Sequence, residues 1–265
     1  MKQGIIIYKH ADSEKNRYFI DLCLEKLNDE GYSLIYVDEE DYEQYLAAHQ
    51  IDYAIYRGRD YTISEKLVAL NTRVFNPPTT NLIANDKHIS CKLFNHLGLP
   101  SIDTQVIPND LSYPYIMKSV DGHGGKEVFL INDESKRLRL LAKYPNKKFI
   151  YQPFISNDGD LRIYLVNQKY VASVARHNSK DFRHNFSLGG DIVLYHPSEK
   201  LIKEAEMLAQ ELKADFIGID LFLIGEKYLF NEIEDPVGCR MLYKLSDIDI
   251  ISLFVDHIKR ELSKE

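Results

Sequence analysis

The sequence predicts a mixed fold, in which an α/β segment is followed by an α+β segment rich in antiparallel strands. From residue 1 to about 76, short apolar runs alternate with helical patterns, which is typical of a small parallel sheet covered by helices. The prolines of NPPTTN, residues 76–81, end this alternation and indicate a domain boundary. We therefore expect domains at 1–80 and 81–265, the second divided into a smaller part (about 87–148) and a larger part (149–265).

The first domain contains four candidate strands and three candidate helices. The strands are expected at 4–8, 32–38, 52–58 and 73–76, and the helices within 13–31, 39–49 and 62–71. The turn after the first strand reads YKHADSE. It has no glycine fingerprint, so a dinucleotide cofactor is not expected there.

The second domain begins with a helical pattern over residues 81–98, which Gly98 and Pro100 should end. Strands are then expected at 103–107, 113–120, 126–131 and 148–155, with a helix at 134–144. A hairpin over 161–177 should turn near Asn167, and a polar loop continues through Gly190. The last elements are a helix at 198–213, a hairpin at 216–234 and a terminal helix.

Composition limits the classes of function. The 265 residues are 45% hydrophobic and 28% charged, which is ordinary for a globular protein. The net charge of −7 argues against a broad nucleic-acid surface. Neither a membrane span nor a secretory signal is evident, so we expect a cytoplasmic protein that needs no membrane. The three cysteines lack CxxC spacing and are interpreted as apolar fillers.

The stretch DGHGGK, residues 121–126, follows an apolar strand that contains Lys118. A buried lysine requires a negative partner, and glycines let backbone amides approach it closely. The spacing is not that of a P-loop. A glycine-rich hairpin without function would explain the loop alone equally well, but Lys118 and Lys126 on its two sides favour a phosphate ligand.

A second constellation is the acidic hairpin FIGIDLFLIGEKYLFNEIE. If three residues, Gly225 to Lys227, form its turn, Asp220 lies opposite Glu232, and Glu234 projects from the same face. Three carboxylates this close repel one another, and Mg²⁺ is the natural neutralising cation. The alternative is an acidic face that is simply solvated.

A third cluster of donors lies in SVARHNSKDFRHNFSLGGD and includes Arg176, Arg183 and Asn185. Such donors suit an anion that is held during a reaction, although a solvated basic loop is the plain alternative. His177 and His184 lack a metal-ligand partner at helical spacing and are given no catalytic role.

In their order along the chain, these motifs resemble the ATP-grasp superfamily, and within it the RimK-like carboxylate–amine ligases. NDKHISCKLFNHLGLPSIDT, YPYIMKSVDGHGGKEV, YQPFI, GDLRIYLVNQKYVASVAR, DFRHNFSLGGD, GIDLF and NEIEDPVG span residues 81–240. The resemblance implies an ATP-grasp fold preceded by a pre-ATP-grasp α/β domain, with 87–148 as the lid subdomain.

The resemblance also implies site residues. ATP would be bound by Lys87, Lys118, Gly122, Gly124, Gly125, Lys126, Gln152, Pro153, Phe154, Ile155, Asp160, Arg183 and Asn185. Arg162, Arg176 and Arg183 would be catalytic, and Asp220, Glu232 and Glu234 would bind Mg²⁺ or Mn²⁺ as a pair of ions. The third metal position is usually Asn in this family, and Pro153 replaces a common acidic residue.

The implied activity is the ATP-dependent joining of an acid to an amine through an acyl phosphate, with release of ADP and phosphate. An ATP-grasp kinase and a nucleotide-binding module without turnover are the alternatives. The substrates would be small molecules or a peptide or protein tail, and the protein would be a monomer or a homo-oligomer. Arg57, Arg59 and Arg240 are candidates to bind a substrate carboxylate, although solvated surface arginines explain them nearly as well.

Overall fold

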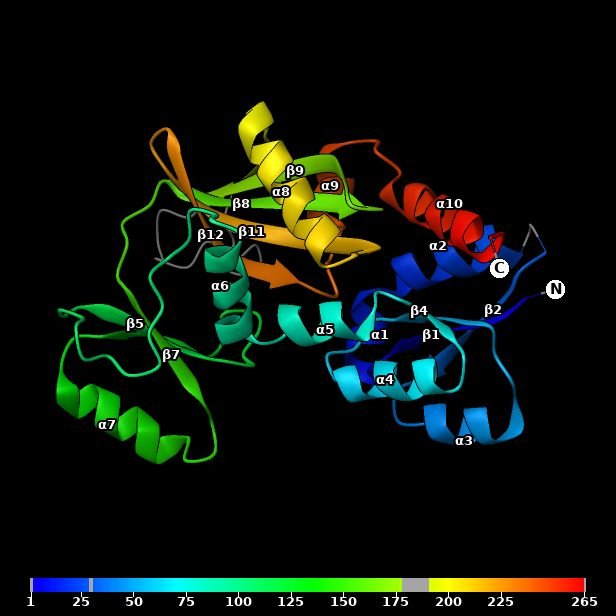
Figure 1. Cartoon of the computed structure of the whole chain (residues 1–265), viewed down its shortest axis with the longest axis horizontal. Coiled ribbons are helices and arrows are strands. Elements are labelled where there is room, and N and C mark those ends of the chain that lie inside the picture. The colour runs from blue at the N-terminus through cyan, green and yellow to red at the C-terminus, as the bar shows by residue number, and fades with distance from the viewer. Residues whose placement is uncertain (1, 29–30, 178–190, 265) are drawn as a thin grey trace.

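The computed structural model describes residues 2–28, 31–177 and 191–264. The described residues form three sheets: a four-stranded parallel sheet, a three-stranded antiparallel sheet and a five-stranded antiparallel sheet. Figure 1 shows the parallel sheet at one end of the molecule, the small antiparallel sheet at the other, and the large sheet beside both. The mixed fold class expected from the sequence is confirmed.

The N-terminal sheet has the strand order β2-β1-β3-β4. Ile6 of β1 packs into the core that contains α2, while Ile5 and Ile7 pack into the core on the opposite face with α3 and α4. The run of three isoleucines therefore reflects a parallel sheet that is covered on both faces. Its elements are β1 (Gln3–Tyr8), α1 (His10–Lys15), α2 (Arg17–Asn28), β2 (Ser33–Asp38), α3 (Tyr42–Ala48), β3 (Tyr53–Tyr56), α4 (Tyr61–Ala69) and β4 (Arg73–Phe75).

The single helix expected over 81–98 is wrong, because the chain forms two helices, α5 (Pro78–Ala84) and α6 (Lys87–His96). Asp86 caps α6 by accepting a hydrogen bond of 2.9 Å from the backbone of Ile89. This cap restarts the helix in a new direction. It also makes Lys87 the first residue of α6.

The small sheet has the order β6-β5-β7. It contains β5 (Tyr115–Ser119), β6 (Val128–Ile131) and β7 (Phe149–Pro153), and α7 (Glu134–Lys143) connects β6 to β7. The strand expected at 103–107 is wrong. Within the described chain, that segment is tied to the sheet by one bridge, between Gln105 and Tyr151.

The large sheet has the order β10-β9-β8-β11-β12. The β8–β9 hairpin turns at Asn167 and Gln168, which have φ angles of 49° and 62°, as expected from the sequence. The remaining elements are β8 (Gly159–Val166), β9 (Lys169–His177), β10 (Asp191–Leu194), α8 (Glu199–Glu211), β11 (Phe216–Ile224), β12 (Lys227–Glu234), α9 (Arg240–Leu245) and α10 (Ile250–Leu262).

The last helix, α10, returns to the N-terminal domain and lies beside α2 (Figure 1). The ring of Phe254 lies 6.4 Å from that of Phe19, 6.4 Å from that of Phe75 and 5.0 Å from that of Phe216, measured between centroids. These rings come from α2, β4 and β11. One hydrophobic core therefore joins the parallel sheet to the large antiparallel sheet.

Two further expectations can be checked across the fold. Cys23, Cys91 and Cys239 are buried and unbonded to one another, in agreement with their interpretation as apolar fillers. Among the helices of the described residues, none has the length and apolar character required to cross a bilayer.

Candidate functional site

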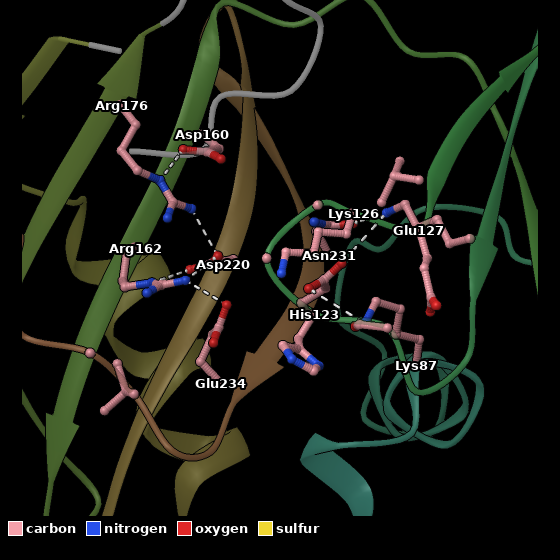
Figure 2. A pocket seen from close by; sticks show the side chains of 18 of the residues that line it. Lys87, His123, Lys126, Glu127, Asp160, Arg162, Arg176, Asp220, Asn231 and Glu234 are labelled. Carbon is pink, nitrogen blue, oxygen red and sulfur yellow. Dashed lines mark hydrogen bonds and ion pairs between the residues drawn. The ribbon is translucent and has the colours of Figure 1, made fainter. Parts of the chain in front are cut away.

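A cleft of about 430 Å³ lies where the three sheets meet. Every site residue that the sequence predicted within the described ranges lines this cleft. Arg183 and Asn185 lie outside the described residues. Figure 2 shows the large sheet on one side of the cleft and the glycine loop with Lys87 on the other.

Two lysines face one carboxylate across the cleft. Lys118 of β5 is only 5% exposed, and its ammonium group lies 3.8 Å from Glu232 Oε1. Lys87 Nζ lies 3.8 Å from Glu232 Oε2 and donates to the Gly122 carbonyl of the glycine loop. Burial lowers the pKa of Lys118, and nearby Lys87 adds to this effect, while Glu232 opposes it. An arriving anion would relieve the repulsion between the two lysines.

The acidic hairpin pairs Asp220 with Glu232, as the sequence predicted, but by a different route. Its turn has two residues rather than three, since Ile224 pairs with Lys227. A bulge between Asp220 and Leu221 then shifts the register by one residue and leaves Asn231 as the extra residue of β12. Lys118 donates a hydrogen bond of 2.8 Å to the side-chain oxygen of Asn231.

Arginines from β8 and β9 bind the carboxylates of the hairpin. Arg162 donates two hydrogen bonds of 2.7 Å to Asp220 and one of 2.6 Å to Glu234. Arg176 donates to Asp220 at 2.8 Å and also to Asp160. Figure 2 shows Arg162 between its two carboxylate partners. Forked contacts of this kind fix the orientation of both groups.

The two aspartates of this network have opposite pKa shifts. Burial alone would raise the pKa of Asp220, but the guanidinium groups of Arg162 and Arg176 hold it well below its ordinary value. Burial raises the pKa of Asp160 to about 7, because Arg176 offsets only part of the burial and Asp220 adds repulsion. Asp160 therefore carries less negative charge than Asp220 near neutral pH.

The three predicted metal ligands suit Mg²⁺ in their donor chemistry, since all are carboxylates that line one cleft. Burial raises the pKa of Glu234, although Arg162 opposes this effect. In the described part of the chain, no three acidic, histidine or cysteine side chains are arranged to hold a metal ion. Arg162 instead forms ion pairs with both Asp220 and Glu234. A metal ion would compete with Arg162 for these carboxylates, and the metal site stays a prediction.

The predicted adenine-binding segment, Gln152 to Ile155, continues from the end of β7 along the cleft. Gln152 is buried and donates a hydrogen bond of 2.8 Å to Thr104 Oγ1. Ile102, Ile116, Val128 and Phe222 contribute apolar surface to the same cleft. A flat heteroaromatic ring would find apolar walls here and backbone groups at one edge.

The N-terminal domain forms the remaining wall. Arg57 is only 4% exposed and donates to the Val237 carbonyl and to the Tyr8 hydroxyl. These contacts make it a structural tie between domains, so the expectation that it binds a substrate carboxylate is not favoured. Arg59 is more accessible and lies 3.3 Å from Asp12. Arg240 is exposed at the cleft.

Sequence reasoning missed several residues of the cleft, including Asn231, His123 and Asp12. The sequence carries no signal for Asn231, because its position depends on the bulge. Asp12 was open to prediction, since it follows the carboxyl end of β1, where ligands of parallel sheets tend to bind.

A glycine loop and two lysines that face an acidic hairpin of the large antiparallel sheet across one cleft are the arrangement of the ATP-grasp class. The chain belongs to the family of RimK-like ATP-grasp domains, which matches residues 78–258. The D-alanine–D-alanine ligase of Bacillus anthracis, solved with ATP, superposes with a TM-score of 0.76 at 15% identity, covering 98% of this chain and 97% of that one. The expected ATP-grasp fold is thereby confirmed.

Two relatives show how far the similarity extends in sequence. An uncharacterized protein of Mycoplasma pneumoniae, an MG011 homolog, is 28% identical over 279 residues, covering 100% of this chain and 96% of its own length. A probable alpha-L-glutamate ligase of Pasteurella multocida is 27% identical over 207 residues, covering 73% of this chain and 66% of its own length. Membership of this family supports a ligase.

Proposed function

We propose that the protein joins a carboxylic acid to an amine at the expense of ATP, through an acyl phosphate. The observation that carries this proposal is the meeting of Lys87 and Lys118 with Glu232 in one cleft, at 3.8 Å each. Phosphoryl transfer depends mainly on positioning and on the offset of developing charge. The side chains of this cleft can position the reacting groups and can offset the charge that develops on the phosphate.

The chain's own groups would act in sequence. The lysines and the glycine loop hold the phosphates while a carboxylate oxygen of the acid attacks the γ-phosphorus, and the bond to ADP breaks. The amine then attacks the carbonyl carbon of the acyl phosphate, and phosphate leaves with that oxygen. Arg176 or Arg162 would stabilise the oxyanion of the tetrahedral intermediate. When bound at Asp220, Glu232 and Glu234, Mg²⁺ would offset charge on the β- and γ-phosphates.

The substrates are proposed to be a small acid and an amine, or a peptide or protein tail. The similarity to a probable alpha-L-glutamate ligase favours amino acids. Part-buried Arg59 and exposed Arg240 both line the cleft and offer guanidinium groups to the acid. An Arg59→Ala variant should raise the KM of the acid about tenfold or more, as expected for the loss of a charged hydrogen bond, and unchanged kinetics would refute this role.

Isotope transfer tests the reaction itself. The protein is incubated with ATP, Mg²⁺ or Mn²⁺, and amino acids whose carboxyl groups carry oxygen-18, and the inorganic phosphate is analysed by mass spectrometry. An acyl phosphate predicts one labelled oxygen in each phosphate released, together with one ADP. ADP without free phosphate would indicate a kinase instead, and the absence of ADP under every condition would indicate a binding module.

A further inference from the structure

The amine that attacks an acyl phosphate must lose a proton, and the cleft offers few groups that can accept it. Six carboxylates line the cleft, and each already has a cationic partner. The partners are Arg59 for Asp12, Lys147 for Glu127, Arg176 for Asp160, Arg162 for Asp220 and Glu234, and Lys87 with Lys118 for Glu232. Protonating any of them would weaken an existing ion pair. Asp160, whose pKa is raised to about 7, is also only 6% exposed, so it is poorly placed to pass a proton on to solvent.

His123 differs from these groups. Among the described residues that line the cleft, it is the single imidazole, and it projects from the glycine loop into the cleft (Figure 2). Gly124 and Gly125 follow it with φ angles of 65° and 72°. This left-handed backbone suits glycine and fixes the direction of the loop at the histidine.

We propose that the imidazole of His123 accepts the proton that the attacking amine loses when the amide bond forms. This inference rests on the proposed function and adds a catalytic residue to it. As the C–N bond forms, the surplus proton on nitrogen passes to a ring nitrogen of His123. The C–O bond to phosphate breaks, and the imidazolium then releases its proton to solvent.

The surroundings of His123 keep it ready for this role. Partial burial in the cleft lowers its pKa, and Arg59 and Lys87 lower it further, which favours the uncharged ring that a proton acceptor needs. Asp12 and a hydrogen bond to the backbone of Asp121 act in the opposite direction and would stabilise the ring once it is protonated. The negative charge of a bound triphosphate would strengthen that effect.

Hydroxylamine separates this role from the earlier steps. It is largely unprotonated at neutral pH and captures acyl phosphates without help from a base. Wild type and His123→Gln are given ATP, Mg²⁺ and a mixture of the standard L-amino acids, with or without hydroxylamine. Hydroxamate is measured as its iron complex, and peptide products are measured by mass spectrometry.

We expect His123→Gln to lower the rate of peptide formation by about 100-fold, the usual size of general-base catalysis. Hydroxamate formation should change less than about threefold, because it bypasses the proton transfer. The pH profile of peptide formation should also lose the inflection below pH 6.5, the ordinary pKa of histidine. His96→Gln, an exposed change outside the cleft, should alter neither rate.

Two results would overturn this inference while leaving the proposed function intact. If both rates fall together in His123→Gln, the residue binds ATP or the acid instead, and if neither falls, the proton leaves by another route. A wild-type protein that forms no hydroxamate would defeat the proposed function, and the inference with it. Because His123 is an exposed residue, the substitution should leave the fold intact.

Discussion

Glu232 is the residue on which the charge balance of the cleft depends, since both lysines face it. We expect Glu232→Gln to lower ATP turnover by at least about 100-fold, because under the proposed function the change would weaken metal binding and leave two lysines without their carboxylate. ADP release at saturating Mg²⁺ measures this loss. Circular dichroism should show that the fold is retained, while the thermal unfolding midpoint should fall because buried Lys118 loses its partner.

Glu226→Gln is the matched control for this prediction. Glu226 lies in the exposed turn of the same hairpin and outside the cleft. Its removal should leave turnover within about twofold, as for most surface substitutions. Full activity of Glu232→Gln would remove the metal assignment from this carboxylate.

Asp160 predicts a pH dependence of stability. Its pKa is raised from 3.8 to about 7 in the folded protein, so the folded state holds a proton that the unfolded state has already lost. The resulting stabilisation is complete below about pH 4 and is lost as the pH rises through about 7. The loss is at most about 1.4 kcal/mol per pH unit.

Asp160→Asn isolates this effect, because asparagine does not titrate. Urea unfolding of both proteins between about pH 4 and pH 7 should show the wild type losing stability relative to the variant as the pH rises. Other titrating groups are shared and largely cancel. If the difference in unfolding free energy between the two proteins does not change with pH, or changes in the opposite direction, Arg176 keeps Asp160 ionised over the whole range.

At the scale of elements, the start of α6 connects a helix cap to the cleft. Asp86→Ala removes the bond to Ile89 and should cost about 1 kcal/mol of folding stability. Because Lys87 is the next residue, the affinity for ATP should fall as well. Calorimetric titration of ATP together with urea unfolding measures both effects.

The control is another helix cap. Asp133 accepts a hydrogen bond of 2.8 Å from Lys136 at the start of α7, away from the lining of the cleft. Asp133→Ala should cost a similar stability and leave ATP affinity unchanged. Equal loss of affinity in both variants would show that destabilisation alone is responsible.

Elements that depend on local pattern were predictable, and those that depend on distant contacts were not. The β8–β9 hairpin and α8 follow from periodicity and turn residues. The break between α5 and α6 carries a local signal in Asp86. However, the Asn85 side chain also donates a hydrogen bond of 2.8 Å to the carbonyl of the distant Asp235. The apolar pattern continues across the break, so the pattern alone predicts one helix. The bulge at Asn231 could not be predicted from the sequence, because its hydrogen-bond partner Lys118 lies on another sheet.

The candidate site was predictable for a different reason. Each motif is weak alone, but burying a charged side chain in an apolar strand costs folding free energy. Charged residues at such positions, here Lys118, Asp220 and Glu232, therefore indicate a functional site. Their meeting in one cleft was implied by the resemblance to the ATP-grasp superfamily, in which these motifs occur in the same order. The arginine network was not foreseen, because the pairing of Arg162 with Glu234 depends on the register of three strands.

At the scale of the whole molecule, the packing of α10 predicts that the parallel sheet and the large antiparallel sheet unfold as one cooperative unit. Phe254 is 1% exposed and touches rings of the N-terminal domain and of the large sheet. Phe254→Ala should cost about 3–5 kcal/mol. Hydrogen exchange of β1 and β8 amides should accelerate equally, because both elements share this core.

Leu253 provides the comparison on the same helix. It is 43% exposed, so Leu253→Ala should cost about 0.5 kcal/mol or less. Faster exchange confined to β1 in the Phe254 variant would show instead that the two domains unfold independently.

The two walls of the cleft are encoded by separate stretches of the chain. Lys87, Lys118 and the acidic hairpin with its bound arginines, Arg162 and Arg176, lie within residues 78–258, which match the family, whereas Asp12, Arg57 and Arg59 lie before them. Under the proposed function, substitutions at Asp12 and Arg59 would change the wall proposed for the acceptor, while the side chains proposed to bind phosphate would keep their places. Chimaeras that exchange residues 1–77 with those of a relative would therefore test whether this segment sets the choice of substrate.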